Sequence, residues 1–266
     1  MIFEKLIIGA VAGDMIGSRH TGNKFEVVDF SLLNKDPDYT ADTVLTVATM
    51  DALLNGREYT TMMQAYGRRY PGRGYGAALL RWLRQDEPKP YHSWNNGVAL
   101  RISPIGHVCR TVNETLEESR KCAEISHNHP DGIKGAQATA ACVFLAKNGR
   151  TKEEIRSYIE TKFGYDLQKN IEIIRPEYYY DQSCEISVPA AIIAFLDSSD
   201  YENAIRLAIS LGDGCGSLAC ITGGIAQAFY KKIPGHIAEP VISRLSPEMF
   251  DVIEKFSFTY PLSLFY

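Results

Sequence analysis

The sequence predicts an all-α fold, and three observations carry that prediction. Apolar residues recur at spacings of three and four along most of the 266-residue chain, which is the period of an α-helix. No run of four to eight residues alternates cleanly between apolar and polar, and the Asn96-Gly97 pair lacks the β-branched flanks of a hairpin turn. Glycine and proline breakers fall between the periodic segments. We therefore expect a single-domain, orthogonal helical bundle.

The breakers separate the periodic segments and so place each helix in order. An Asn-Gly or Pro-Gly pair is a turn signal, and proline ends a helix because its ring removes a backbone donor. Helices are expected over residues 3–16, 43–54, 75–83, 116–126, 133–147, 152–163, 188–196, 201–211, 217–230 and 239–256. The breakers between them are Asn55-Gly56, Pro71-Gly72, Pro88 with Pro90, Asn148-Gly149, Pro176 and Pro234-Gly235.

Two long connections and one aromatic run are candidates for lining a pocket. Residues 18–39 and 85–98 are polar and punctuated by glycine or proline, and long loops in compact domains are usually functional or disordered. The run Tyr178-Tyr179-Tyr180 offers stacking surface to a ligand, although packing in the core is the favoured interpretation of such rings. We expect both loops to rim a cleft.

Composition favours one domain over residues 1–266 that binds neither nucleic acid nor membrane. The chain is 45% apolar, and no Pro/Gly/Ser-rich or charge-rich stretch divides it. Its 28 basic and 32 acidic side chains include no Lys/Arg run that could follow a nucleic acid. No segment approaches the roughly 20 uninterrupted apolar residues of a membrane helix. The six cysteines form no CxxC pair, which indicates free thiols and a cytoplasmic location.

Five short segments stand out in order along the chain. They are Gly9-Ala10 with Gly13-Asp14 and Gly17; Tyr39-Thr40-Ala41-Asp42-Thr43; Asn96-Gly97 with Ala99 and residues 101–104; His127-Asn128-His129-Pro130 with Gly132 and Gly135-Ala136; and residues 212–217 leading to Gly223-Gly224. Together with Arg175-Pro176 and Ser187-Val188-Pro189, they resemble the motifs of the ADP-ribosylglycohydrolase family of the DraG type over roughly the whole chain.

The resemblance implies an all-helical domain with an ADP-ribose cleft and two magnesium ions at its base. In the family, the ligands of these ions come from two helix starts, one bearing a Thr-Asp-Asp triplet and the other an Asp-x-Asp-Thr/Ser motif. Such a helix start suits the task because it presents closely spaced oxygen ligands to a hard cation. The metal ions there orient the ribose and its leaving group.

This chain departs from the family pattern where the acids are expected. The early triplet corresponds to Thr40, Ala41 and Asp42, and a further family glutamate falls at or near Thr21. The late motif aligns without gaps to Gly214 and Gly216, with Ser217 keeping an oxygen. Clustered carboxylates without a cation repel one another, so a site that loses its metal gains by losing its acids. The pattern predicts no cofactor, with residual magnesium on Thr40, Asp42 and Ser217 as the alternative.

A second register of the late motif keeps two other side chains. A shift of one residue lets Asp213 and Cys215 stand for the two aspartates. A thiolate is a poor magnesium ligand and favours zinc or iron, yet no second soft ligand lies nearby in the sequence. The same glycine-rich turn also suits an anion, because the start of the following helix carries partial positive charge.

Several of these residues also have a structural interpretation that does not depend on the family resemblance. Thr40 is suited to cap a helix, and Asp42 in the first turn complements the helix dipole. Asp14 lies inside an apolar helix, where a carboxylate needs partners, so a structural bond to a neighbouring helix end and a functional role are both open. The ligand-binding candidates that the resemblance adds are Asn96, Gly97, Arg101, His127, His129, Gly132, Gly214 and Gly216.

Three functional hypotheses follow. The first is a non-hydrolytic binder or regulator that holds ADP-ribose, a related nucleotide or an ADP-ribosylated protein. The second is an active hydrolase of an N- or O-glycosidic ADP-ribosyl bond, with Asp42 and Asp213 as base or single-metal ligands and Asp14 in support. The third is a purely structural role, which an occluded cleft would favour.

Overall fold

In the computed structural model, which describes residues 5–21, 29–33 and 38–262, every regular element is a helix. The all-α prediction is confirmed. The helices are α1 (Gly9–Gly17), α2 (Ala41–Asn55), α3 (Tyr59–Arg69), α4 (Ala77–Arg84), α5 (Gly97–Leu100), α6 (Ser103–Val108), α7 (Val112–Glu124), α8 (Pro130–Lys147), α9 (Lys152–Phe163), α10 (Ile171–Ile174), α11 (Cys184–Asp197), α12 (Tyr201–Ser210), α13 (Cys215–Tyr230), α14 (Gly235–Arg244) and α15 (Pro247–Thr259).

The predicted helices are present, and the largest differences from the prediction concern two of them. The first was expected from residue 3, yet α1 begins at Gly9 because the Gln227 side chain engages the backbone before it. Its Oε1 atom accepts bonds from the N–H groups of Ile8 (2.9 Å) and Gly9 (2.6 Å), and its Nε2 donates to the Leu6 carbonyl at 2.6 Å. A long-range side-chain contact therefore overrides the local helical pattern.

The predicted helix over residues 239–256 is two helices, which corrects the boundary drawn from periodicity. Leu245 has extended backbone angles, and the Ser246 hydroxyl accepts a bond from the Met249 N–H at the start of α15. Pro247 occupies the first turn, where its missing N–H costs no helical bond. Helix α3 and the short helices α5, α6 and α10 were not predicted from the sequence.

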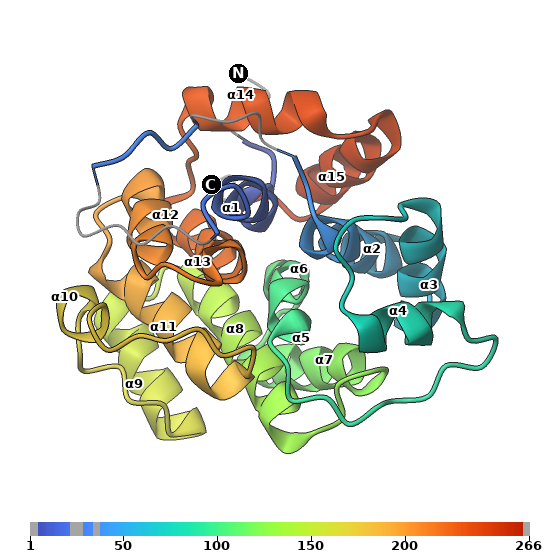
Figure 1. The fold of residues 1–266 in the computed structure, drawn as a ribbon, viewed down its shortest axis with the longest axis horizontal. Coiled ribbons are helices and arrows are strands. Elements are labelled where there is room, and N and C mark those ends of the chain that lie inside the picture. Colours follow the sequence, from blue (N-terminus) through green and yellow to red (C-terminus); the bar gives the residue numbers. More distant parts are fainter. Residues whose placement is uncertain (1–4, 22–28, 34–37, 263–266) are drawn as a thin grey trace.

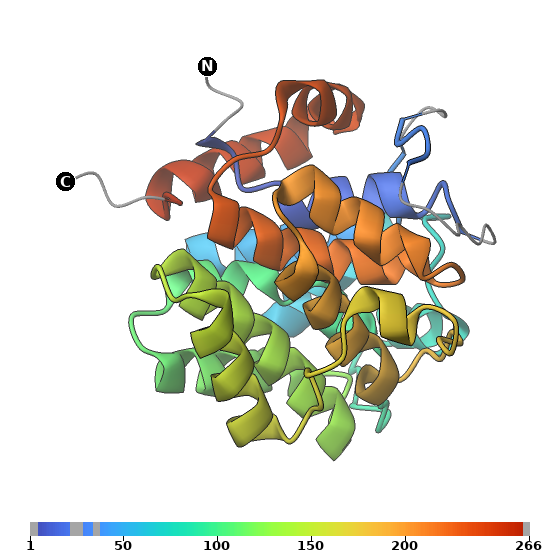
Figure 2. The ribbon, with the colours of Figure 1, turned by 90° about the vertical axis from the view of Figure 1, so that its left-hand side faces the viewer.

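Helix α13 runs through the centre of the bundle. Nearly all of its residues are buried. Figures 1 and 2 show α14 and α15 on one side of α1 and α13, and α8, α9 and α11 on the other. The functional interest of this arrangement is that the first turn of α13 reaches one end of the core, close to the C-terminal end of α1.

Three glycines fix how closely α1 approaches α13. A methyl group on Gly13 would lie well under 3.0 Å from the backbone of Ala219, a separation that real Cβ atoms do not show. A Cβ atom on Gly9 would likewise lie under 3.0 Å from the Gly223 carbonyl oxygen, and one on Gly17 would lie 2.7 Å from the Cys215 carbonyl oxygen. Each step of four residues on one helix matches a step of four on the other. We call this antiparallel contact the glycine seam.

The structure also bears on the predictions for the cysteines and for membrane-spanning helices. All six cysteines are free thiols, as predicted. None of the described helices combines the length and apolarity needed to cross a bilayer.

Candidate functional site

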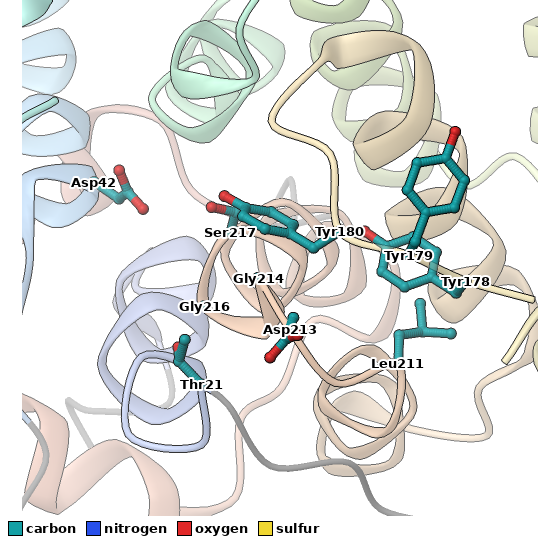
Figure 3. Close-up of a pocket in the computed structure, with 10 residues that line it drawn as sticks. All are labelled: Thr21, Asp42, Tyr178, Tyr179, Tyr180, Leu211, Asp213, Gly214, Gly216 and Ser217. Atoms are coloured by element: carbon teal, nitrogen blue, oxygen red, sulfur yellow. The ribbon is translucent and has the colours of Figure 1, made fainter. Parts of the chain in front are cut away.

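A cavity of about 630 Å³ opens where α1, α2 and α13 bring their ends together. Figure 3 shows its lining, with Asp42 projecting from α2 toward the centre and Tyr180 and Ser217 facing it. The turn after α1, the turn before α13 and the segment before α11 supply the other walls. The lining residues are Thr21, Asp42, Tyr178, Tyr179, Tyr180, Leu211, Asp213, Gly214, Gly216 and Ser217.

Asp14 joins α1 to the start of α2 and does not line the cavity. Its Oδ2 atom accepts bonds from the N–H (3.1 Å) and hydroxyl (2.6 Å) of Thr43. Thr40 donates its hydroxyl to Oδ1 at 2.7 Å and its N–H to Oδ2 at 3.0 Å. Burial raises the pKa of Asp14, while these four bonds act in the opposite direction. Of the two roles left open, the structure favours the bond to a neighbouring helix end.

We expect Asp14→Asn to lower the free energy of unfolding by about 3 kcal/mol, because the amide nitrogen cannot accept the bonds that one carboxylate oxygen accepts. Urea denaturation followed by circular dichroism measures the change. Asp200→Asn is the matched control, since Asp200 caps α12 through one oxygen and asparagine caps a helix equally well. A loss no larger than that of the control contradicts the structural role of Asp14.

Thr40 is the N-cap of α2, as the sequence suggested. Its hydroxyl accepts a bond from the Asp42 N–H at 3.2 Å while it donates to Asp14. Both of its hydrogen-bonding roles are therefore used inside the protein, and Thr40 is absent from the cavity lining. The structure does not bring Thr40 together with Asp42 and Ser217 as a set of cavity oxygens.

Asp42 is the one half-buried carboxylate in the lining, whereas Asp213 lies exposed at the rim. Burial raises the pKa of Asp42 well above its usual range, and the nearby Asp14 charge adds to the rise. The positive charge of Arg101 opposes both effects. A carboxyl group with a raised pKa at the base of a cavity is suited to hydrogen bonding and to proton transfer.

Arg101 is a buried cation beside the cavity rather than a lining residue. Only 1% of its surface is exposed, and its strongest bond runs from Nη2 to the Ser126 hydroxyl at 2.8 Å. Its Nε atom has no acceptor. Within the described residues no carboxylate lies within ion-pair distance of Arg101, so its charge acts on Asp42 through space.

The Asn96-Gly97 pair starts α5 and holds the segment before α11 in place. The Asn96 N–H donates to the Gln182 carbonyl at 2.6 Å, and its Nδ2 donates to the Ser187 hydroxyl at 2.9 Å. The Gly97 N–H donates to the Asn95 side chain at 2.9 Å. These groups bond within the protein and lie outside the cavity lining, although Asn96 also lies within reach of the Tyr180 hydroxyl.

The histidine segment lies beside α8 and likewise outside the lining. His127 is buried, its Nδ1 pairs with the Ser126 hydroxyl at 2.8 Å, and burial lowers its pKa well below the usual range. His129 caps α8 by accepting the Asp131 N–H at 3.2 Å. A Cβ atom on Gly132 would lie 2.7 Å from the Ser93 carbonyl, so this glycine permits a close backbone approach.

At the start of α13, the Tyr180 ring covers Gly214. A Cβ atom there would overlap that ring, and Gly214 has a φ of +75°, in the left-handed region that favours glycine. Gly216 has more room, because the nearest atoms to its Cβ atom would be the Ser18 backbone at 3.2 Å, which is a tight contact. Of the two positions where the ungapped register expects aspartates, position 214 is covered by a ring and position 216 borders a neighbouring turn.

The second register finds no support in the geometry. Cys215 is buried, and its Sγ atom donates to the Gly17 carbonyl at 3.2 Å. Burial raises the pKa of its thiol to about 11. Asp213 lines the cavity and is exposed, whereas Cys215 is absent from the lining, so the structure does not present the two side chains to the cavity as a pair.

The oxygen atoms of the lining do not fit the pair of magnesium ions that the resemblance implies. Among the described residues, no group of three or more His, Cys, Asp or Glu side chains is placed to hold a metal ion. One or two carboxylates with water suffice for a single magnesium ion, but two adjacent divalent ions require more negative charge. Among the described residues, the carboxylates of the lining are Asp42 and the exposed Asp213.

The tyrosine run lines the cavity with all three rings, although packing in the core was the favoured interpretation. Tyr178 also packs against the core, whereas Tyr179 is 66% exposed. Leu211 was missed altogether. Three consecutive aromatic residues followed by Asp181 cannot all face a core from one extended segment, and that was the signal available in the sequence.

Comparison with known proteins adds independent findings. The family model described as ADP-ribosylglycohydrolase matches residues 3–257. ADP-ribosylarginine hydrolase Tri1 of Pseudomonas putida is 30% identical over 65% of this chain, a region that spans about half (52%) of that relative. ADP-ribosylhydrolase ARH3 of Danio rerio is 24% identical over 86% of this chain and 82% of its own length, and human ARH3 is 23% identical.

A solved structure described as an ADP-ribosylglycohydrolase-related protein complex has the same fold. It superimposes with a TM-score of 0.73 over 97% of this chain and 98% of that chain, at 20% identity.

Proposed function

The chain belongs to the ADP-ribosylglycohydrolase family, and on that premise we propose that it binds the ADP-ribosyl group in the cavity between α2 and α13 without hydrolysing it. Its partner is then free ADP-ribose, a related nucleotide or an ADP-ribosylated protein. The open cavity of about 630 Å³ supports a binding function over a purely structural one, since it has room for a ribosyl group and its neighbours.

The observation that carries the proposal is the packing of Tyr180 on Gly214. The ring takes the space that an acidic side chain at position 214 would need, and the left-handed backbone there favours glycine. In the ungapped register this is one of the positions where the family pattern places a metal-binding acid. The ring can pack there because position 214 has no side chain, so the glycine at this position and the placement of the ring are consistent with each other.

Isothermal titration with ADP-ribose tests the binding part. We expect an affinity that EDTA does not change and that Asp42→Asn weakens about tenfold, because the amide removes one acceptor from the base of the cavity. Asp251→Asn, an exposed change on α15, is the matched control. No heat of binding with ADP-ribose or any other nucleotide contradicts the proposal, and so does an affinity that depends on magnesium.

A second candidate function is hydrolysis of an ADP-ribosyl glycosidic bond with Asp42 as general base. It is favoured by the raised pKa of Asp42 and by the names of the relatives Tri1 and ARH3, which are hydrolases. Under this alternative, release of ADP-ribose from ADP-ribosyl-arginine or ADP-ribosyl-serine disappears in Asp42→Asn and persists in Asp251→Asn. Such release would replace the non-hydrolytic proposal.

A further inference from the structure

The Tyr180 side chain does more than fill space, because its hydroxyl group faces the cavity. Figure 3 shows this hydroxyl beside Ser217, on the side of the ring that looks toward Asp42. The side chains of Ser217, Asn96 and Gln182 lie near this hydroxyl and act to lower its pKa, against the rise that burial causes. The ring packs against the Gly214 backbone. Its hydroxyl at the cavity edge can both donate and accept a hydrogen bond.

The oxygens around this point come from separate elements of the fold. Tyr180 belongs to the segment before α11, Ser217 to the first turn of α13, and Asp42 to the first turn of α2. Hydroxyl groups both donate and accept, so this set matches the hydroxyls of a sugar, which also donate and accept. The face of an aromatic ring additionally suits the apolar C–H face of a sugar.

The charges in the lining decide which part of a nucleotide sugar fits here. Among the described residues, the lining contains no lysine or arginine, whereas it contains the carboxyl groups of Asp42 and Asp213. A phosphate group would therefore meet acids without a paired cation, which is unfavourable. A neutral diol, in contrast, finds both hydrogen-bond donors and hydrogen-bond acceptors in this lining. The geometry selects the ribosyl group and places the phosphates outside this part of the cavity.

We propose that the Tyr180 hydroxyl, together with Ser217 and Asp42, forms a metal-free subsite for the vicinal hydroxyl groups of the ribosyl unit. This inference rests on the proposed binding function and assigns to Tyr180 a role in recognition. In it, protein oxygens hold the diol directly. Tyr180 is thereby a specificity-determining residue, because it distinguishes ligands that carry the distal ribose from those that lack it.

The test compares the affinities of ADP-ribose and ADP, by isothermal titration in EDTA, for the wild-type protein and three variants. Tyr180→Phe keeps the ring and removes only the hydroxyl, and we expect it to weaken ADP-ribose binding about tenfold while ADP is unaffected. Ser217→Ala is also expected to weaken ADP-ribose binding, because it removes the Ser217 hydroxyl group from the subsite. Tyr158→Phe is the matched control, since Tyr158 lies on α9 outside this cavity lining, and we expect no change.

The outcomes separate the two proposals. If the wild-type protein binds ADP-ribose and both Tyr180→Phe and Ser217→Ala bind it equally well, the subsite is wrong and the binding function stands. An equal loss of affinity for ADP-ribose and ADP also overturns the subsite, because it indicates a general disturbance of the cavity. If Tyr180→Ala binds more tightly than wild type, the ring is a plug rather than a contact. If the wild-type protein binds no nucleotide, the binding function and the subsite fall together.

Discussion

Replacing Gly13 by alanine is expected to lower the free energy of unfolding by at least about 3 kcal/mol. The added Cβ atom would lie well under 3.0 Å from the carbonyl group of Ala219 and 2.9 Å from the Cys220 nitrogen. These are backbone atoms of a buried helix, so they cannot rotate away as a side chain would. The helices must separate, which disturbs packing along the whole glycine seam.

Chemical denaturation of Gly13→Ala measures this loss, and Gly235→Ala is its control. Gly235 begins α14, and its nearest neighbour to a new Cβ atom is a side-chain oxygen of Glu239 at 3.7 Å. Alanine is a better helix former than glycine, so this control is expected to be neutral or stabilised by up to about 1 kcal/mol. A Gly13→Ala protein as stable as the control would show that α1 does not rest on the backbone of α13.

The second large effect is expected at Gly214, where two costs combine. Gly214→Ala must hold an L-residue at a φ of +75° and must also displace the Tyr180 ring. The first cost is about 1 to 2 kcal/mol and the second adds roughly as much again. We expect a total loss of about 3 kcal/mol in the free energy of unfolding, and aspartate at this position to be at least as damaging.

A control and a double variant separate these costs. Gly72 has the same φ of +75° with no atom within 4 Å of a new Cβ atom, so Gly72→Ala reports the backbone strain alone. In a Tyr180→Ala background, Gly214→Ala should cost no more than Gly72→Ala, because the ring is gone. An unchanged cost in that background would mean that the ring does not press on Gly214.

This result bears on any attempt to rebuild the family's metal site in this chain. Aspartates at positions 41, 214 and 216 would supply the acids that the ungapped register lacks. The structure indicates that they cannot be accommodated while Tyr180 is present, since its ring covers position 214. Magnesium-dependent thermal stabilisation is therefore expected only when Tyr180→Ala accompanies the three acidic substitutions.

The fold was largely predictable because helical periodicity is a local signal. The range 152–163 was predicted without error for α9, whose Thr151 and Glu154 form a capping box. The failures come from contacts that no local pattern records. Gln227 shortens α1 from more than 200 residues away along the chain, and tertiary bonds of this kind have no signature in a window of sequence.

The candidate site was predictable in its location and less so in its parts. Asp42, Asp213, Gly214, Gly216 and Ser217 were named and do line one cavity. Asp14 was left open between two roles, because its partner Thr43 lies 29 residues away and only the folded chain brings them together. The role of the tyrosine segment in lining the cavity was not the favoured prediction, because the local sequence favours burial of its rings. Aromatic residues are usually buried, and nothing local shows that a neighbouring helix begins beneath them with glycine.

The glycine seam also limits how this protein can respond to a ligand. Backbone rests on backbone at three successive levels, so α1 cannot slide along α13 by a small amount without a collision. The next equivalent setting is a whole four-residue step away, about 6 Å of travel at 1.5 Å per residue. The two helices are therefore held at one relative position along their axes. Any adjustment on ligand entry has to come from the tyrosine segment and the surrounding turns, while this pair moves as one body.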